Sequence, residues 1–194
     1  GKMFIDSRLQ LVSPDKTWSI VFLPDRIDFN YNYQQGTNVC KNIDGLLIIV
    51  KELIKKVFSV VSATIGNRLA LNCRLALENM TEDDLSQFCN RFTKPLSAYN
   101  QESFVEWSVR FNSRGKFKIS EDKEEECNRI TEMMQMDAQQ SPIQGTDNHG
   151  VVLSIDVNTL QQNMSQRFQY NHLIRFDNEA AKFIADIAKE VEGC

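Results

Sequence analysis

Arginine, carboxylate and asparagine side chains recur at every second position of several strand-like segments. Alternate residues of a strand point to the same side, so we expect these groups to share one face of a sheet. That face would carry seven basic and three acidic residues: Arg8, Arg26, Arg68, Arg74, Arg110, Lys116, Lys118, Asp28, Glu106 and Asp156. Guanidinium groups match the geometry of carboxylates and phosphates. The face therefore offers the chemistry of anion binding.

The site predicted on this face comprises Arg68, Asn72, Arg74, Glu106, Arg110 and Asp156. One hypothesis is a non-enzymatic binding or assembly module, which favours a homodimer formed through this face or through a sheet edge. The alternative is an enzyme acting on an anionic small molecule or nucleotide. Arg74 and Arg110 would then clamp the substrate, with Asp156 or Glu106 as the general base. A third interpretation is an ordinary solvated face of an antiparallel sheet.

Other reaction chemistry has little support in the residue pattern. The sequence contains no phosphate-binding glycine loop and no nucleophile elbow. Neither of the two histidines, His149 and His172, has a second ligand at metal spacing, so we predict no metal and no cofactor. The five cysteines lack a CxxC spacing, which favours reduced thiols and a cytoplasmic protein. Cys73 is expected in the core, with a nucleophilic role as the alternative.

The overall charge limits the partners of this protein. Its net charge is −4 at pH 7, which argues against nucleic acid. Sheets that bind RNA stack bases on exposed aromatic rings, and here only Phe104 has the right parity. The most apolar run, 46–50, meets Lys51 and Glu52 and falls far short of the roughly 20 residues that span a bilayer. We therefore predict no membrane association.

The elements that position these residues follow from hydrophobic periodicity. The length of 194 residues and the 42% hydrophobic content predict one α+β domain over 1–194. Alternation predicts strands within 9–11, 18–22, 27–33, 69–77, 105–111, 117–119 and 151–157. Helical spacing predicts helices over 43–61, after Thr81, over 121–136, and after Asp177 or Asn178. We expect a hairpin turn at 112–115 and a loop at 139–150, while 159–176 fits either helix or strand.

These elements predict a largely antiparallel, twisted sheet with the helices on one face and the polar face opposite. Both halves of the chain run strands first and a helix later. This order permits a duplicated unit of sheet and helix, with halves 1–97 and 98–194.

The strand from Arg68 to Leu77 resembles one in a sporadically distributed prokaryotic family of uncharacterised proteins. That family has an Arg-hydrophobic-Gly-Leu-Arg-Tyr strand in this place, and Arg68 and Leu71 match it. The run 153–157 is similar to its later strand, which contains an Asp. The chain departs from the family pattern at three positions: Ala70, Asn72 and Cys73. The family has no established activity, so the resemblance implies no catalytic residue and no cofactor.

Overall fold

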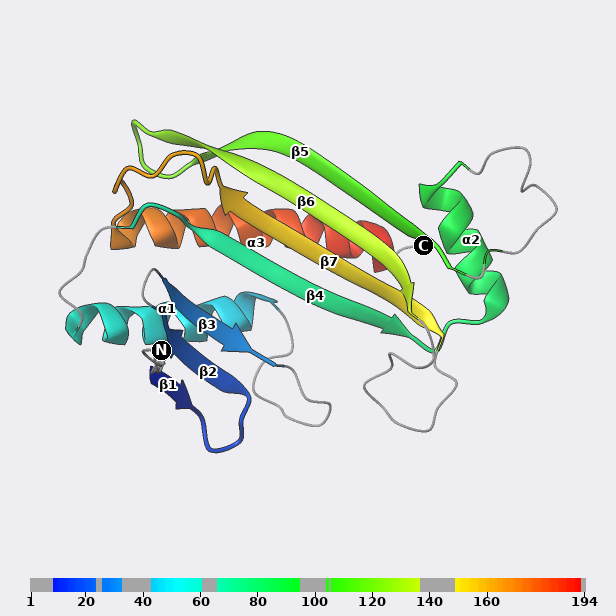
Figure 1. Cartoon of the computed structure of the whole chain (residues 1–194), viewed down its shortest axis with the longest axis horizontal. Coiled ribbons are helices and arrows are strands. Elements are labelled where there is room, and N and C mark those ends of the chain that lie inside the picture. Colours follow the sequence, from blue (N-terminus) through cyan, green and yellow to red (C-terminus); the bar gives the residue numbers. More distant parts are fainter. Residues whose placement is uncertain are drawn as a thin grey trace, which may run out of the picture. The chain divides into compact units, whose positions relative to one another are not determined.

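The computed structural model describes residues 9–23, 26–32, 43–60, 66–94, 104, 106–136 and 149–192. Three helices and seven strands follow one another in the order β1 β2 β3 α1 β4 α2 β5 β6 β7 α3 within these residues (Figure 1). The predicted α+β class is confirmed, and its strands form two antiparallel sheets. Residue contacts divide the chain into two compact units, Gly1–Val61 and Ser62–Cys194. The single domain over 1–194 and the halves 1–97 and 98–194 stay predictions.

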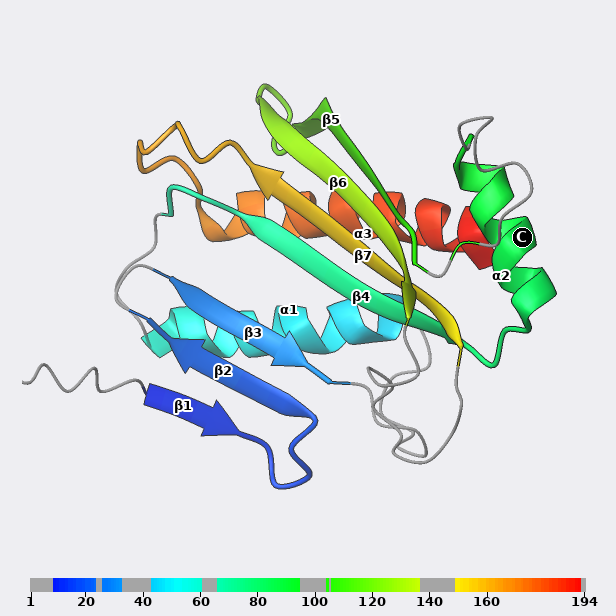
Figure 2. The ribbon, with the colours of Figure 1, turned by 45° about the vertical axis from the view of Figure 1, so that its right-hand side comes forward.

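The first unit contains a three-stranded meander and a helix. Its elements are β1 (Leu9–Val12), β2 (Trp18–Phe22), β3 (Ile27–Tyr31) and α1 (Ile43–Val60), and the strand order is β1-β2-β3 (Figure 2). The turn between β1 and β2 is closed by Asp15, whose carboxylate accepts hydrogen bonds from Ser13 and Thr17. The three strands and the helix predicted in this part of the sequence are confirmed for the described residues.

The second unit contains a four-stranded sheet and two helices. Its elements are β4 (Ala70–Glu78), α2 (Glu82–Phe92), β5 (Ser108–Lys118), β6 (Glu124–Met136), β7 (Gly150–Thr159) and α3 (Tyr170–Glu192). The strand order is β4-β7-β6-β5, and all neighbours are antiparallel. The sheet therefore places β4 at one edge and β5 at the other.

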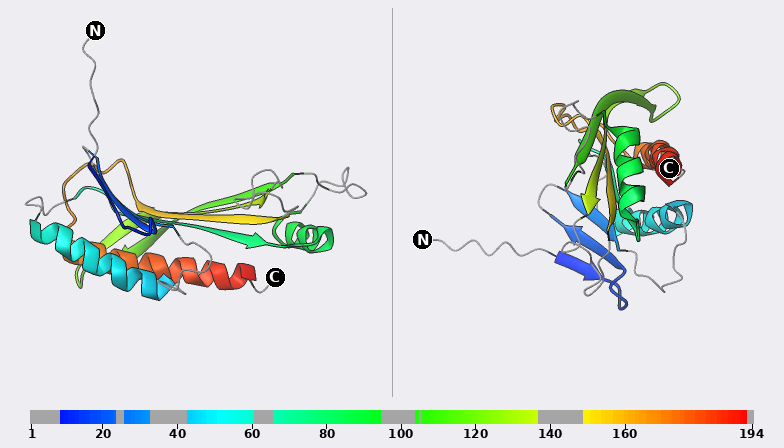
Figure 3. Two further views of the ribbon diagram at one scale, coloured as in Figure 1. Left: turned by 90° about the horizontal axis from the view of Figure 1, so that it is seen from below. Right: turned by 90° about the vertical axis from the view of Figure 1, so that its right-hand side faces the viewer.

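Helix α3 lies along one face of the four-stranded sheet (Figure 3). The ring of Phe176 meets that of Phe117 at 5.9 Å between centroids, and Phe176 is fully buried. Leu153 and Ile155 of β7 are 1% and 2% exposed on the same face. Burial of each side chain of this size contributes about 1.5 to 3 kcal/mol, so this layer is the core of the unit.

Helix α2 begins, as predicted, after Thr81, which caps it. The Thr81 hydroxyl accepts from the Asp84 backbone N–H at 3.1 Å, and the Asp84 carboxylate accepts from the Thr81 N–H at 2.9 Å. The helix buries Phe88 against Trp107, with 5.8 Å between ring centroids. It therefore covers the end of the sheet where β5 begins.

The predicted helix over 121–136 is wrong, because 124–136 is the strand β6. The segment carries apolar residues on both faces, including Ile130 on one and Met133 on the other, so it lacks a clean period of two. Its acidic start lies opposite the basic end of β5, where Lys116 faces Glu126 and Lys118 faces Glu124. Pairing with β5 thus overrides the local helical preference.

The predicted hairpin turn at 112–115 is also wrong. Strand β5 runs without a break from Ser108 to Lys118, and the chain reverses at 119–123, where Ile119 N–H donates to the Lys123 carbonyl at 3.0 Å. Gly115 has a packing role instead. A Cβ there would lie 2.5 Å from Cζ of Arg129, whose guanidinium sits over the rings of Phe117 and Phe183. The absent side chain makes room for that guanidinium.

Helix α3 begins at Tyr170, seven residues before the predicted cap. Asp177 is therefore not an N-cap and lies buried within the helix. The ambiguous segment before Tyr170 is neither helix nor strand; Arg167 holds it in place by donating to Glu125 at 2.7 Å and to the Asn67 carbonyl at 2.6 Å. Both partners of this ion pair are about nine-tenths buried. The predicted loop at 139–150 lies, except for its last two residues, outside the described residues.

Candidate functional site

The even-numbered residues of β4, β5, β6 and β7 form the face of the sheet opposite α3, here called the open face. The uninterrupted registers place them on one side, because residues opposite each other in a ladder share a face. Its outer residues are exposed on both edges, including Asn72 and Arg74 on β4 and Arg110 and Asn112 on β5. Helix α3 packs on the opposite face (Figure 3). The central residues of the open face are less accessible than its edges, with Asn158 and Val152 only 4% and 5% exposed.

One row of the open face crosses all four strands with alternating charge. The row consists of Arg74, Ser154, Glu132 and Arg110. Neighbouring strands lie about 4.8 Å apart, so the Cα atoms of Arg74 and Arg110 are separated by about 14 Å. Glu132 lies between the two arginines. They are therefore not adjacent clamps for one small anion.

A chain of side-chain hydrogen bonds links two neighbouring rows of the open face. Asn72 lies directly opposite Asp156. Asn128 donates to Asn158 at 3.2 Å, and Asn158 donates to Asp156 at 2.9 Å. Asn158 is only 4% exposed. The two amides and the carboxylate thus fix one another in the middle of the face.

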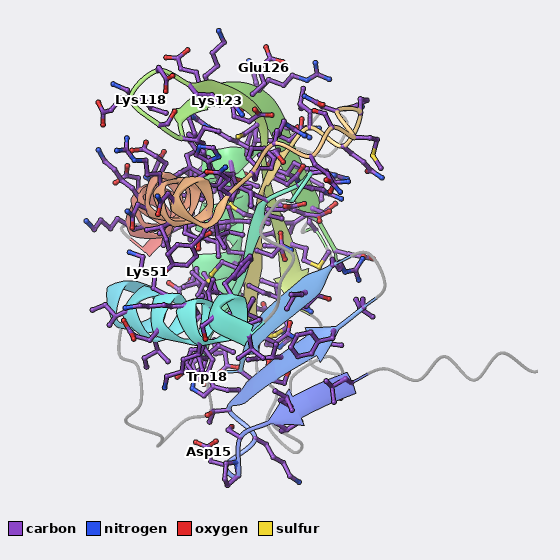
Figure 4. All side chains as sticks on the ribbon, turned by 90° about the vertical axis from the view of Figure 1, so that its left-hand side faces the viewer. Asp15, Trp18, Lys51, Lys118, Lys123 and Glu126 are labelled. Atoms are coloured by element: carbon purple, nitrogen blue, oxygen red, sulfur yellow. The ribbon has the colours of Figure 1, made fainter. Side chains whose placement is uncertain are left out.

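Charges on the open face are balanced. It carries five basic and five acidic residues: Arg74, Arg110, Arg114, Lys116, Lys118, Glu78, Glu124, Glu126, Glu132 and Asp156. Lys116 and Glu124 form an exposed ion pair at 3.8 Å. Figure 4 shows Lys118 and Glu126 close to the β5–β6 turn. The positive surplus expected from parity is not found on this face.

Four of the six predicted site residues, Asn72, Arg74, Arg110 and Asp156, lie on the open face. Arg68 and Glu106 are exposed but precede β4 and β5 rather than lying within them. Asp28, expected on the same face, lies in β3 of the three-stranded sheet, and Arg26, just before β3, pairs with it at 3.1 Å. Arg8 lies outside the described residues.

Sequence reasoning missed seven polar members of the open face: Glu78, Asn112, Arg114, Glu124, Glu126, Asn128 and Glu132. Glu132 and Asn128 fell in the segment predicted as a helix, and Arg114 in the segment predicted as a turn. The β-branched pair Ile130 and Thr131 is the only local signal for a strand there. The basic end of β5 and the acidic start of β6 indicate strand pairing only once the register between the two strands is known.

The described thiols have the properties of buried structural groups. Burial raises the pKa of the Cys127 thiol to about 12, and it also raises the pKa of Cys73. Cys73 lies on the face that α3 covers but is only half-buried, whereas it was expected in the core. A thiol that stays protonated at neutral pH is a poor nucleophile. No group of three His, Cys, Asp or Glu among the described residues could hold a metal ion.

Comparisons with family models, curated proteins and solved structures gave no match. The resemblance of the strand at 68–77 to the prokaryotic family stays a prediction. No helix within the described ranges is long and apolar enough to cross a membrane.

Proposed function

We propose that the protein is a non-enzymatic binding module that docks another protein on the open face of its four-stranded sheet. The observation that carries the proposal is the row of Arg74, Glu132 and Arg110, which alternates in charge, with both arginines exposed and Glu132 half-buried between them. A partner surface with the complementary order of acid, base and acid would pair with all three.

The charge pattern favours a protein over a compact anion. A phosphate or carboxylate lodged between Arg74 and Arg110 would lie against Glu132 and be repelled by it. A polyanion such as nucleic acid would also meet the five acidic residues of the face. A protein surface carries both signs and can match each position separately.

The layout of the open face also fits a protein interface. Next to the charged row lies a row with less polar residues, Ala76, Val152, Met134 and Ser108. Ala76 and Ser108 are exposed at its two ends, Met134 is half-buried, and Val152 is buried between them. Protein interfaces commonly combine an apolar core with a polar rim, and Met and Arg are enriched in them.

A cytoplasmic location is part of the proposal. The described cysteines Cys73, Cys89 and Cys127 are free thiols. Free thiols suit the reducing conditions of the cytoplasm.

The proposal can be tested by reversing the two outer charges. Immobilised wild-type protein and the double variant Arg74→Glu with Arg110→Glu would be exposed to the same extract, and retained proteins identified and purified. The control is Lys182→Glu with Lys189→Glu, which makes the same charge change on exposed positions of α3. The partner should bind wild type and control alike, and the double variant at least about 100-fold more weakly, since a reversed pair loses attraction and adds repulsion.

Two results would contradict the proposal. One is a set of purified partners that bind wild type and the Arg74→Glu/Arg110→Glu variant equally well. The other comes from thermal denaturation with inorganic phosphate, nucleotides and anionic metabolites. A stabilisation that the double variant loses would instead favour an enzyme or carrier for an anionic small molecule.

A further inference from the structure

The outer edge of β1 is the most exposed apolar strand edge among the described residues. All four residues of β1 are exposed, with Leu9 at 58%, Leu11 at 50% and Val12 at 53%. Strand β1 lies at the end of the three-stranded sheet, and no described strand pairs with its outer side (Figure 2). It carries no charged residue and no proline, the two features that usually protect an edge from pairing.

The backbone of β1 offers a complete set of hydrogen-bonding groups on this edge. The Ser13 N–H donates to the Trp18 carbonyl at 2.9 Å, which fixes the alternation of the β1–β2 ladder. In an antiparallel pair every second residue bonds to its neighbour. Leu9 and Leu11 therefore bond to β2, while the N–H and C=O groups of Gln10 and Val12 point outward.

The side chains of β1 extend an apolar face that ends abruptly at this edge. Leu11 lies opposite Ile20, which is 8% exposed, and Leu9 lies opposite Phe22, which is intermediate in exposure. Exposure thus rises steeply from β2 to β1 along one face. A further strand beside β1 would continue the face and cover the two leucines.

We infer that a second copy of this chain pairs with β1, antiparallel and around a two-fold axis, so that two three-stranded sheets join into one of six strands. The inference is independent of the proposed function of the open face. Outward-pointing residues must pair with outward-pointing residues, so Gln10 lies opposite Gln10 or Val12 of the second copy. In the first register Leu9 packs against Leu11 of the second copy, and in the second the two Leu11 side chains meet.

The strand is complementary to itself, which is why a second copy fits this edge. A two-fold axis places β1 beside an identical strand of the second copy. A charge on this edge would therefore lie near the same charge on the other copy and be repelled by it. Leu-Gln-Leu-Val brings no like charges together and places leucine beside leucine in both registers. Four paired residues per copy bury less area than stable dimers do, so we expect weak, reversible association.

Sedimentation velocity of the full chain, from about 10 µM to about 1 mM, tests the inference. The wild type should shift from monomer to dimer across this range. Gln10→Pro removes one outward N–H and leaves the β1–β2 ladder intact, and Leu11→Lys places like charges at the axis. Each should raise the dimer dissociation constant at least tenfold. Thermal unfolding of both variants checks that the fold is kept.

Two control variants separate this edge from other surfaces. Asn30→Lys adds a charge at an exposed position of β3, the opposite edge of the same sheet, and should dimerise like the wild type. Arg74→Glu with Arg110→Glu should do so too, since the open face takes no part. A wild type that stays monomeric up to 1 mM would overturn the inference. So would a dimer that withstands both Gln10→Pro and Leu11→Lys.

Discussion

The edge strands β1 and β5 offer the same backbone geometry and carry opposite side chains. On β5 the bond from the Gln135 N–H to the Trp107 carbonyl fixes the ladder so that even-numbered residues point their backbone groups outward. Four of those six residues are basic: Arg110, Arg114, Lys116 and Lys118. On β1 the outward residues are Gln10 and Val12. Charge protects one edge from pairing and is missing from the other, and this contrast underlies the pairing that we infer for the β1 edge.

The two edges also differ in how they are anchored. Strand β6, the neighbour of β5, is fixed by the buried ion pair between Arg167 and Glu125. Strand β1 is joined to β2 by a turn around Asp15, a carboxylate at the exposed tip of the sheet (Figure 4). The charged β5 edge thus belongs to a sheet that a buried ion pair anchors. The uncharged β1 edge belongs to a sheet that a bound second copy could stabilise.

The largest effect is expected at the anchor of the protected edge. Arg167→Ala leaves Glu125 buried without its counter-charge, which should lower the free energy of unfolding by about 3 to 5 kcal/mol in urea denaturation. Arg175→Ala is the control, because Arg175 pairs with Glu121 at 2.9 Å on the surface. Its loss should cost less than about 1 kcal/mol. Equal losses in the two variants would show that the buried pair is no special anchor.

Removing the charges of the β5 edge should allow this edge to pair with a second copy, as we infer for β1. In a Gln10→Pro background, Arg114→Val with Lys116→Val should strengthen self-association about 100-fold, or about 2.7 kcal/mol, by sedimentation velocity. The matched control, Arg114→Lys with Lys116→Arg, keeps the positive charges on the edge and should stay monomeric. Association of the control, or none in the valine variant, would refute the role assigned to these charges.

The continuity of β5 depends on Gly115. Gly115→Ala should destabilise the protein by about 1 to 3 kcal/mol, because the new Cβ overlaps the Arg129 guanidinium at 2.5 Å. Gly66→Ala is the control, since its Cβ would meet nothing closer than 3.9 Å. Chemical denaturation compares the two. A neutral Gly115→Ala would mean that Arg129 moves aside without cost.

The smallest expected effect is the loss of stability at low pH, when Asp15 in the turn between β1 and β2 is protonated. Hydrogen bonds from Ser13 and Thr17 hold the pKa of Asp15 below its ordinary value of 3.8. A lowered pKa means that this contribution to stability is present above 3.8 and is lost as pH falls through the folded-state pKa. The Thr17 amide signal in NMR should shift with a midpoint below 3.8, and Asp15→Asn should remove that titration. A midpoint above 3.8 would contradict the assignment.

The elements that could be predicted from the sequence are those with one clear period. Strands β3, β4 and β7 alternate or run apolar between turn residues, and α1 keeps helical spacing throughout. Strand β6 could not be predicted, because apolar residues occupy both its faces and its charges make sense only opposite β5. The start of α3 was missed because a buried Asp177 looks like a cap in the sequence.

A residue of the candidate site could be predicted only where its strand was predicted correctly. Asn72, Arg74, Arg110 and Asp156 were placed on one face by parity alone. Glu132, which separates the two arginines and balances the charge, was missed together with β6. Register across strands depends on tertiary pairing, so parity within one strand cannot show which charges become neighbours.

Amide hydrogen exchange, followed by NMR at increasing protein concentration, tests the contrast between the two edges most directly. The outward amides of Gln10 and Val12 should become slower to exchange as concentration rises, since a second copy bonds to them. The outward amides of Arg110 and Arg114 should exchange quickly at every concentration. Equal behaviour of the two edges, or no change at Gln10, would contradict the account.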